Sequence, residues 1–158
     1  GPEGNCCNYY ELEINALGTV FDLWLPKPYR EGVKADHDWN VRGLRKAVRV
    51  HGTLNDPSDV DRGWIVELAW PWAAFDRHDH SIAPVPPREG DQWRMNFSRG
   101  QWYLEIVDGR DRKIAGQPEH NWVWSPQGMI DMHQPEYWGF VQFSNLRAPD
   151  TSSDMLCR

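Results

Sequence analysis

The chain has 158 residues, of which 40% are hydrophobic and 25% charged, with a formal net charge of −6. This length suits one domain, no apolar run approaches the ~20 residues that span a bilayer, and the acidic balance argues against nucleic acid, whose phosphates need clustered cations. Ten tryptophans are the unusual feature. Such a composition is common in proteins that stack on sugars, although a tryptophan-rich core would account for much of the same count.

The first third of the chain predicts a hairpin followed by a long loop. Residues Asn8–Asn15 alternate apolar and polar side chains, which is the two-residue period of a half-buried strand. A second apolar run, Thr19–Leu25, follows Gly18 and predicts the partner strand. The charged segment Lys27–Arg42 is expected to be a loop.

Two further strands are predicted in the middle of the chain, at residues 46–54 and 63–70. They are joined by Asn55–Arg62, a segment of Asp, Pro and Ser turn residues. The basic run Arg42–Arg49 is expected to form the solvent-facing side of a strand. Pro71 suits the first position of a short helical turn.

The last third predicts three strands around a proline-rich loop, Ser81–Asp91. Residues 92–99 alternate cleanly, and residues 102–109 are expected to be their hairpin partner. Residues Tyr137–Ser144 form the last predicted strand, and the polar tail 145–158 follows it.

Some seven strands with turn signals between them predict an all-β fold, an antiparallel β-sandwich of the jelly-roll or immunoglobulin-like type. The domain is expected to span residues 1–144, with 145–158 as a polar C-terminal tail. Eight side chains at alternating positions are expected to be mostly buried: Trp64, Val66, Leu68, Trp93, Met95, Phe97, Val141 and Phe143.

Two acidic groups have chemistry to consider. Glu11 and Glu13 share a strand face about 7 Å apart, and glycosidases use two carboxyls at about 5 to 9 Å. Charged residues on a solvated sheet face explain the same pattern without catalysis. Asp56, Asp59 and Asp61 offer oxygens suited to calcium, but an ordinary hairpin loop is the preferred interpretation.

No other group specifies a metal or a cofactor. His78 and His80 lack a third ligand, and the three cysteines lack the spacing of a metal site. Cys157 could bridge Cys6 or Cys7 if the chain is exported. We therefore expect no cofactor, with structural calcium as the open alternative.

Three motifs in order point to a family: E-L-A-W-P-W at residues 67–72, G-D-x-W-R-x-N-F-S-R at 90–99 and W-G-F-V-Q-F at 138–143. From Asn8 to Phe143 the chain resembles the family 9 carbohydrate-binding modules and the family 9-like proteins related to them. The resemblance implies a jelly-roll β-sandwich, related to DOMON domains, that binds polysaccharide ends and small sugars between two tryptophans. Some members hold structural calcium.

The resemblance also implies where the sugar site lies. One tryptophan of the family's clamp falls late in the domain, at Trp122 or Trp124. An indole face suits the C–H surface of a pyranose, while amides and guanidinium groups suit its hydroxyls. The predicted carbohydrate-binding residues are Trp122, Trp124, Trp102, Arg99, Gln127 and Asn121. A structural role for the Trp122–Trp124 pair, closing one end of the sandwich, is the alternative.

Family domains usually begin several strands earlier than this sequence does. We therefore expect the sandwich to be incomplete at the N-terminus, and the apolar face formed by Tyr10, Leu12 and Ile14 to be covered by another chain or segment. The alternative is that the loop Lys27–Arg42 covers this face.

The sequence thus predicts a non-catalytic carbohydrate-binding domain with an extracellular or periplasmic location. A glycoside hydrolase that uses Glu11 and Glu13, or a structural sandwich without a sugar site, are the alternatives. Carbohydrate is the expected partner, with no nucleic acid and no membrane span.

Overall fold

The computed structural model describes residues 8–56, 58–75, 85–108 and 110–146. Within these ranges the chain forms strands and three short 3-10 helices, and no helix is long and apolar enough to cross a membrane. The strands are β1 (Tyr9–Ile14), β2 (Val20–Leu25), β3 (Arg45–His51), β4 (Gly63–Ala69), β5 (Gln92–Met95), β6 (Ser98–Gln101), β7 (Leu104–Val107), β8 (Arg110–Lys113), β9 (His120–Val123) and β10 (Gly139–Gln142). The helices are η1 (Tyr29–Glu31), η2 (Trp72–Phe75) and η3 (Pro135–Tyr137).

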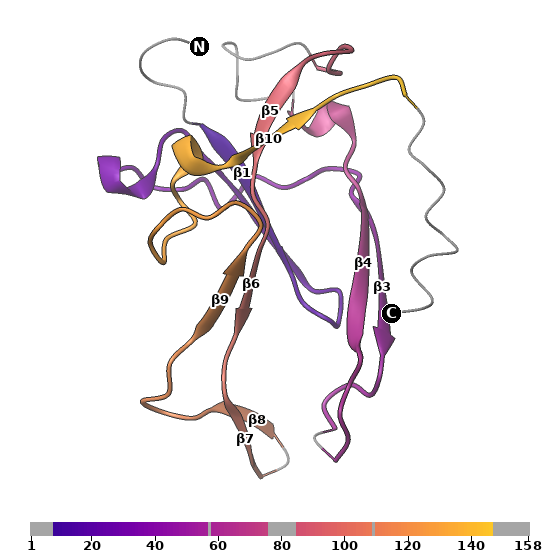
Figure 1. Ribbon diagram of the computed structural model, residues 1–158, viewed down its shortest axis with the longest axis vertical. Helices are drawn as coiled ribbons and strands as arrows, with labels where there is room; N and C mark the ends of the chain where they lie inside the picture. Colours follow the sequence, from indigo (N-terminus) through magenta and orange to yellow (C-terminus); the bar gives the residue numbers. More distant parts are fainter. Residues whose placement is uncertain (1–7, 57, 76–84, 109, 147–158) are drawn as a thin grey trace.

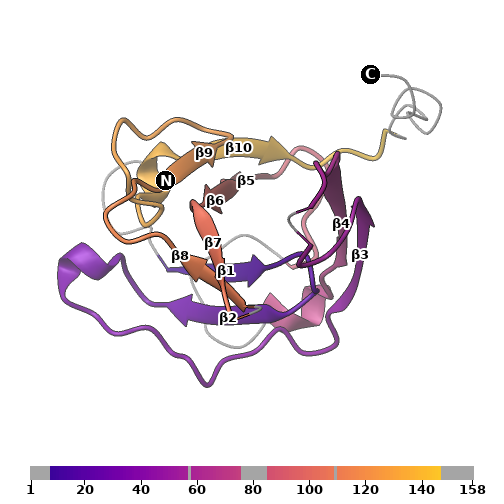
Figure 2. The ribbon, with the colours of Figure 1, turned by 90° about the horizontal axis from the view of Figure 1, so that it is seen from below.

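The strands form five antiparallel pairs: β1–β2, β3–β4, β5–β10, β6–β9 and β7–β8. The β3–β4 pair and the ribbon of β6, β9, β7 and β8 extend as two separate arms (Figure 1), and the view along these arms shows the pairs arranged around a centre (Figure 2). The all-β antiparallel class is therefore confirmed, and the arrangement is compatible with a β-sandwich.

One predicted pairing is wrong. Residues 102–109 do not pair with the strand at 92–99, because β7 turns back onto β8 and forms its own hairpin. The strand at 92–99 instead pairs with β10 through β5 and with β9 through β6. Sequence neighbours were expected to pair, but the β7–β8 hairpin lies between β6 and its partner in the chain.

The buried core lies on both faces of β1–β2. On one face Tyr9, Leu23 and Leu25 pack together, with Trp138 against them. Leu25 is fully buried, and burial of such a side chain contributes about 1.5–3 kcal/mol. This pair is the only one with a buried cluster on each face among the residues that the structure describes.

The other face of β1–β2 is covered by the loop before β3. Trp39 and Val41 from this loop are buried and pack, with Ala74 of η2, against Tyr10 and Leu12. The loop Lys27–Arg42 thus packs on Tyr10 and Leu12, whereas Ile14 lies outside this cluster and all three side chains are half-buried. Whether another chain or segment covers the rest of this face stays a prediction.

Two aspartates hold this loop in place. Asp22 on β2 accepts a hydrogen bond from the backbone N of Val41 at 2.7 Å. The Asp36 carboxylate accepts hydrogen bonds from the backbone N of Asp38 and of Trp39. This Asx turn directs the chain toward the core. The polar side chains of this segment therefore position its two apolar ones.

The predicted core list is only partly correct. Leu68 is 42% and Phe97 62% exposed, so their predicted burial is wrong. The other six are half-buried: Trp64, Val66, Trp93, Met95, Val141 and Phe143. The alternation was identified correctly. However, a pair of strands buries the side chains of one face only where another element packs on that face. Leu68 and Phe97 lie near strand ends, beyond the elements that pack on these pairs.

The strands β5 and β6 are nearly continuous, and Asn96 joins them. Its side-chain oxygen accepts from the backbone N of Ser125 at 2.9 Å, and its amide donates to the Ser125 carbonyl at 3.0 Å. The side chain thus replaces a backbone pair between the two ribbons. It fixes β9, which ends just before Ser125, alongside β6.

Several predictions lie outside the described residues. They concern Cys6, Cys7 and Cys157, the histidines His78 and His80, and most of the tail 145–158.

Candidate functional site

The register of β6 and β9 places six side chains on one face of this ribbon. Arg99 pairs with Trp122 and Gln101 with His120, and directly paired residues project to the same side. Phe97 extends the row, because its carbonyl accepts the backbone N–H of Trp124 at 2.8 Å. We call this surface the aromatic face; its members are Phe97, Arg99, Gln101, His120, Trp122 and Trp124.

The rings of the aromatic face are open to solvent. Trp122 is 54% and Trp124 53% exposed. Neither ring therefore closes the end of a core in the described structure, which was the structural alternative. Three aromatic side chains, His120 and Trp122 of β9 and Trp124 just after it, follow one another at every second residue, about 7 Å along an extended chain, and form a row.

Arg99 lies beside the centre of this row. Its guanidinium carbon is 5.7 Å from the centroid of the Trp122 ring, which is within the range of a cation–π contact. It also donates to the side-chain oxygen of Gln101 at 3.1 Å. The His120 ring lies near Trp122, with centroids 6.0 Å apart and an interplanar angle of 26°.

The Trp124 ring packs against the backbone of Gly139. Its six-membered ring lies where the side chain of residue 139 would project, and a Cβ there would be 2.6 Å from the nearest ring carbon. Phe97 packs against the Trp124 ring edge-on at 5.8 Å. Since Gly139 pairs with Met95, the aromatic face continues the side of β5 that carries Trp93 and Met95.

Two predicted site residues lie on the opposite face of the ribbon. Asn121 pairs with Gly100, and strand alternation turns both away from Trp122. The Trp102 ring lies over Gly100, with a ring carbon 3.5 Å from the position of an added Cβ, and Lys113 caps that ring at 3.7 Å. The structure thus brings Arg99, Trp122 and Trp124 together, and places Asn121 and Trp102 behind them.

Gln127 has a different position again. It is only 5% exposed, and in the orientation that satisfies its amide it donates to the Asp131 carbonyl and accepts from the Trp138 indole. The side chain holds the loop between β9 and η3. Sequence reasoning chose it for an amide that can bind hydroxyls, but the same chemistry serves a buried loop.

Sequence reasoning also missed three members of the aromatic face. Phe97 was assigned to the core, and Gln101 and His120 were not considered. The signal was available, because each lies two residues from a predicted site residue, and alternation puts such neighbours on one face of a strand. Only the pairing of β6 with β9, however, shows that the two sets meet.

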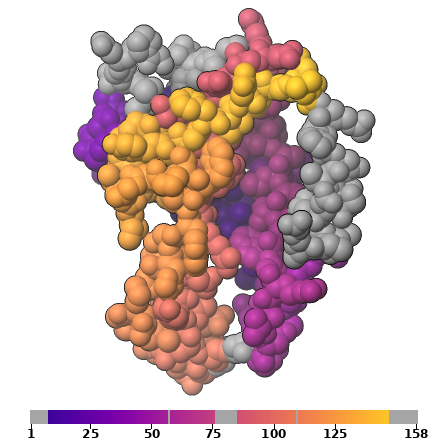
Figure 3. All heavy atoms as spheres, in the orientation of Figure 1, coloured from indigo at the N-terminus to yellow at the C-terminus, as the bar shows by residue number. Residues whose placement is uncertain are grey.

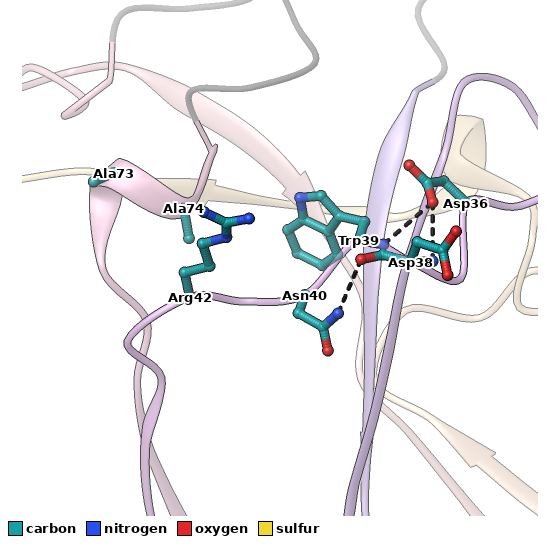
Figure 4. Close-up of a pocket in the computed structure, with 7 residues that line it drawn as sticks. All are labelled: Asp36, Asp38, Trp39, Asn40, Arg42, Ala73 and Ala74. Carbon is teal, nitrogen blue, oxygen red and sulfur yellow. Dashed lines mark hydrogen bonds between the residues drawn. The ribbon is translucent and has the colours of Figure 1, made fainter.

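The space-filling view shows a hollow between the β6–β9 arm and the β3–β4 arm, with atoms of the N-terminal hairpin visible inside it (Figure 3). The best-defined pocket lies elsewhere, between the loop at 36–42 and η2 (Figure 4). It encloses about 160 Å³ and is lined by Asp36, Asp38, Trp39, Asn40, Arg42, Ala73 and Ala74. Ligand pockets usually enclose about 300–1,000 Å³, and Asp36 already serves the loop backbone, so we assign this pocket a structural role.

The carboxylate pair predicted from sequence does show altered electrostatics. Partial burial, and then the charge of Glu13 and a hydrogen bond with it, raise the pKa of Glu11 from its ordinary 4.5 to about 7. Glu11 is thus a partly buried acid beside a second carboxyl, an arrangement that favours its protonated form.

Glu11 belongs to a cluster that fixes the loop at 131–134 on β1. The Tyr9 hydroxyl and His133 Nδ1 are hydrogen-bonded at 2.7 Å, and Glu11 approaches the same nitrogen at 3.6 Å. Burial lowers the pKa of His133, although the charges of Asp131 and Glu13 oppose this. Burial, followed by the charge of Glu11, raises the pKa of Tyr9.

Asp131 completes the cluster. Burial acts to raise its pKa, but hydrogen bonds from the Gln134 side chain and the His133 backbone hold it below the usual range. The cluster joins β1 to the loop that follows the aromatic face in the chain.

The acidic loop between β3 and β4 satisfies its carboxylates internally. Asp61 accepts from the backbone N of Thr53, and Asp59 accepts from the Thr53 hydroxyl, both at 2.7 Å. Gly52 is required here, since a Cβ would lie on the Asp61 carboxylate. No group of three metal-ligating side chains occurs anywhere in the described ranges.

Comparison with known proteins adds no relative: no family model matches the chain, and no curated protein or solved structure is similar to it.

Proposed function

We propose that this protein binds carbohydrate without catalysis, at the aromatic face of β6–β9, as the resemblance to family 9 carbohydrate-binding modules implies. The observation that carries the proposal is the row of exposed rings on β9, with Arg99 across the strand from Trp122. Soluble proteins seldom expose a contiguous aromatic surface without a binding role.

The chemistry of a sugar matches this surface. A pyranose presents C–H groups on its faces and hydroxyls around its rim. Covering about 100 Å² of indole would contribute about 2.5 kcal/mol, while Arg99 and Gln101 would meet the hydroxyls that stacking takes from water. Trp122 and Trp124 are the stacking residues of the proposal, and Phe97 and His120 extend it along the ribbon.

Asn121, Trp102 and Gln127 have indirect roles in this proposal. Trp102 packs over Gly100 and stiffens the ribbon from behind, and Gln127 holds the loop that follows Trp124. The proposed location remains extracellular or periplasmic, where polysaccharides are met.

Isothermal titration against an oligosaccharide panel tests the proposal. We expect binding to at least one oligosaccharide, lost in Trp122→Ala and kept in Trp102→Ala, whose ring lies behind the proposed surface. No heat with any saccharide in the panel, at protein concentrations that detect a millimolar Kd, would contradict it.

A glycoside hydrolase is the second candidate, favoured by one observation: the pKa of Glu11 is raised to about 7, toward the operating pH of a general acid. Release of reducing sugar that Glu11→Gln abolishes would support it. Glu11 also lies 3.6 Å from His133 Nδ1 in the cluster that fixes the loop at 131–134, so we place this candidate second.

A further inference from the structure

We infer that the ligand of the aromatic face is an acidic saccharide, one that carries a carboxylate, and that Arg99 receives that group beside Trp122. This inference rests on the proposed carbohydrate-binding function and names its substrate class.

The charges of the aromatic face support the inference. Among its six side chains, Arg99 is cationic, His120 can become so, and none is a carboxylate. The chain as a whole has a net charge of −6. A face without acidic groups on an acidic protein is complementary to an anion, and such complementarity selects among partners.

Arg99 also differs from two other arginines in its lack of an ion-pair partner within the described residues. Arg30 forms an ion pair with Glu136 at 2.9 Å, and Arg112 lies 3.9 Å from Glu105. Within the described part of the chain, Arg99 has the Gln101 side chain as its hydrogen-bond acceptor and forms no ion pair with a carboxylate. A guanidinium presents five N–H donors in a planar fork that suits a carboxylate.

The position of Arg99 suits a uronic acid in particular. In a pyranuronate the carboxylate projects from the rim of the ring, while the faces remain available for stacking. With the sugar on Trp122, a group at its rim reaches the guanidinium that lies 5.7 Å from the ring centroid. Stacking and the charge-assisted hydrogen bond then act on one sugar unit.

The test compares two matched probes, trigalacturonate and the neutral galactotriose, by isothermal titration with the purified chain. We expect trigalacturonate to bind at least tenfold more tightly, as one charge-assisted hydrogen bond provides. Arg99→Gln should reduce this preference to within about twofold, because it removes the charge that distinguishes the two probes, and it should weaken binding of galactotriose less than binding of trigalacturonate. Raising NaCl from about 0.05 to about 0.5 M should shrink the preference in the same direction.

Arg49→Gln is the matched control, because it removes the same charge from an exposed position on β3, away from the aromatic face. It should keep the preference. Equal binding of both trisaccharides, or equal loss of both in Arg99→Gln, overturns the inference and leaves carbohydrate binding intact. Absence of binding by either probe and by the neutral panel overturns both proposals. Loss of the preference in Arg49→Gln would show that net charge, not Arg99, selects the ligand, and would also overturn it.

Discussion

Two arginine–aromatic pairs lie on neighbouring ribbons of this molecule. Arg94 pairs with Phe140 across β5–β10, with its guanidinium 4.2 Å from the ring centroid, and Arg99 pairs with Trp122 across β6–β9 at 5.7 Å. The two pairs have the same chemistry and differ in their hydrogen bonds. Arg94 donates to the carbonyls of Glu136 and Trp138 at 2.9 and 3.0 Å, whereas Arg99 donates only to an exposed side chain.

The difference separates an arginine that holds the fold from one available to a ligand. Arg94 links η3 to β5, because its N–H groups donate to backbone carbonyls that would otherwise lack partners. Arg99 has no backbone acceptor in the described structure and lies in a row of exposed rings. The hydrogen-bond partners of an arginine, rather than its position over an aromatic ring, therefore indicate its role.

The largest expected effect concerns Glu11, which helps to fix the loop next to η3, the helix that Arg94 contacts. Glu11 and His133 fix the loop before η3, and the pKa of Glu11 is raised from 4.5 to about 7. Its contribution to the free energy of unfolding is complete below pH 4.5 and is lost as pH rises through about 7. The loss is on the order of 3 kcal/mol at most.

Glu11→Gln should therefore flatten the fall in stability between pH 5 and 8, as measured by urea unfolding. The lowered pKa of His133 acts oppositely, since its contribution is present above pH 6.5 and is lost at lower pH. Because Glu11 and His133 are in contact, His133→Gln in both backgrounds separates the two contributions. Parallel curves for the wild type and the variant would show that Glu11 titrates normally.

The next prediction separates the two aromatic rings. Trp122→Ala should weaken oligosaccharide binding by about 50-fold, the equivalent of some 2.5 kcal/mol of stacking. Phe140→Ala removes an equally exposed ring beside Arg94 and should leave the Kd unchanged. Both variants should keep their Tm within about 4 °C, because neither ring is buried. An equal loss of binding in the two would mean that the ligand spans both ribbons.

Much of this comparison could be predicted from sequence. Alternation at residues 92–99 placed Arg94 and Arg99 on opposite faces of that strand. The two-residue spacing of Trp122 and Trp124 placed them together on one face of another segment. The hairpins β1–β2 and β3–β4 were also predictable, because turn residues separate two alternating runs in each case. The assignment of Trp122, Trp124 and Arg99 to one surface agrees with the register.

The rest depends on contacts between distant segments. The pairing of β6 with β9 bypasses the β7–β8 hairpin, and nothing in the local pattern specifies this. The burial of Gln127 depends on Trp138 and Asp131, which reach it only through the fold of the loop. Phe97 is exposed because, within the described ranges, no element packs over it, which alternation cannot reveal.

A third prediction compares the arginines themselves. Arg94→Gln leaves the carbonyls of Glu136 and Trp138 without the guanidinium, and should cost about 2 kcal/mol of unfolding free energy. Arg99→Gln should cost less than about 0.5 kcal/mol, as surface changes do. Thermal unfolding measures both, and a larger loss in Arg99→Gln would assign it a structural role.

The smallest expected effect tests whether Trp124 belongs to the site. Gly139→Ala places a Cβ 2.6 Å from the Trp124 ring, so the ring must move. Because the ring is half exposed, it can turn outward at small cost in stability, but it would leave the row formed with Trp122. We expect about fivefold weaker oligosaccharide binding, the equivalent of roughly 1 kcal/mol.

Gly100→Ala is the matched control for this substitution, since it adds the same methyl group on the opposite face, near Trp102 and the flexible side chain of Glu119. It should leave the Kd unchanged. A shift of the tryptophan fluorescence emission in Gly139→Ala would confirm that the ring has moved. Unchanged binding together with that shift would exclude Trp124 from the site and confine stacking to Trp122, next to Arg99.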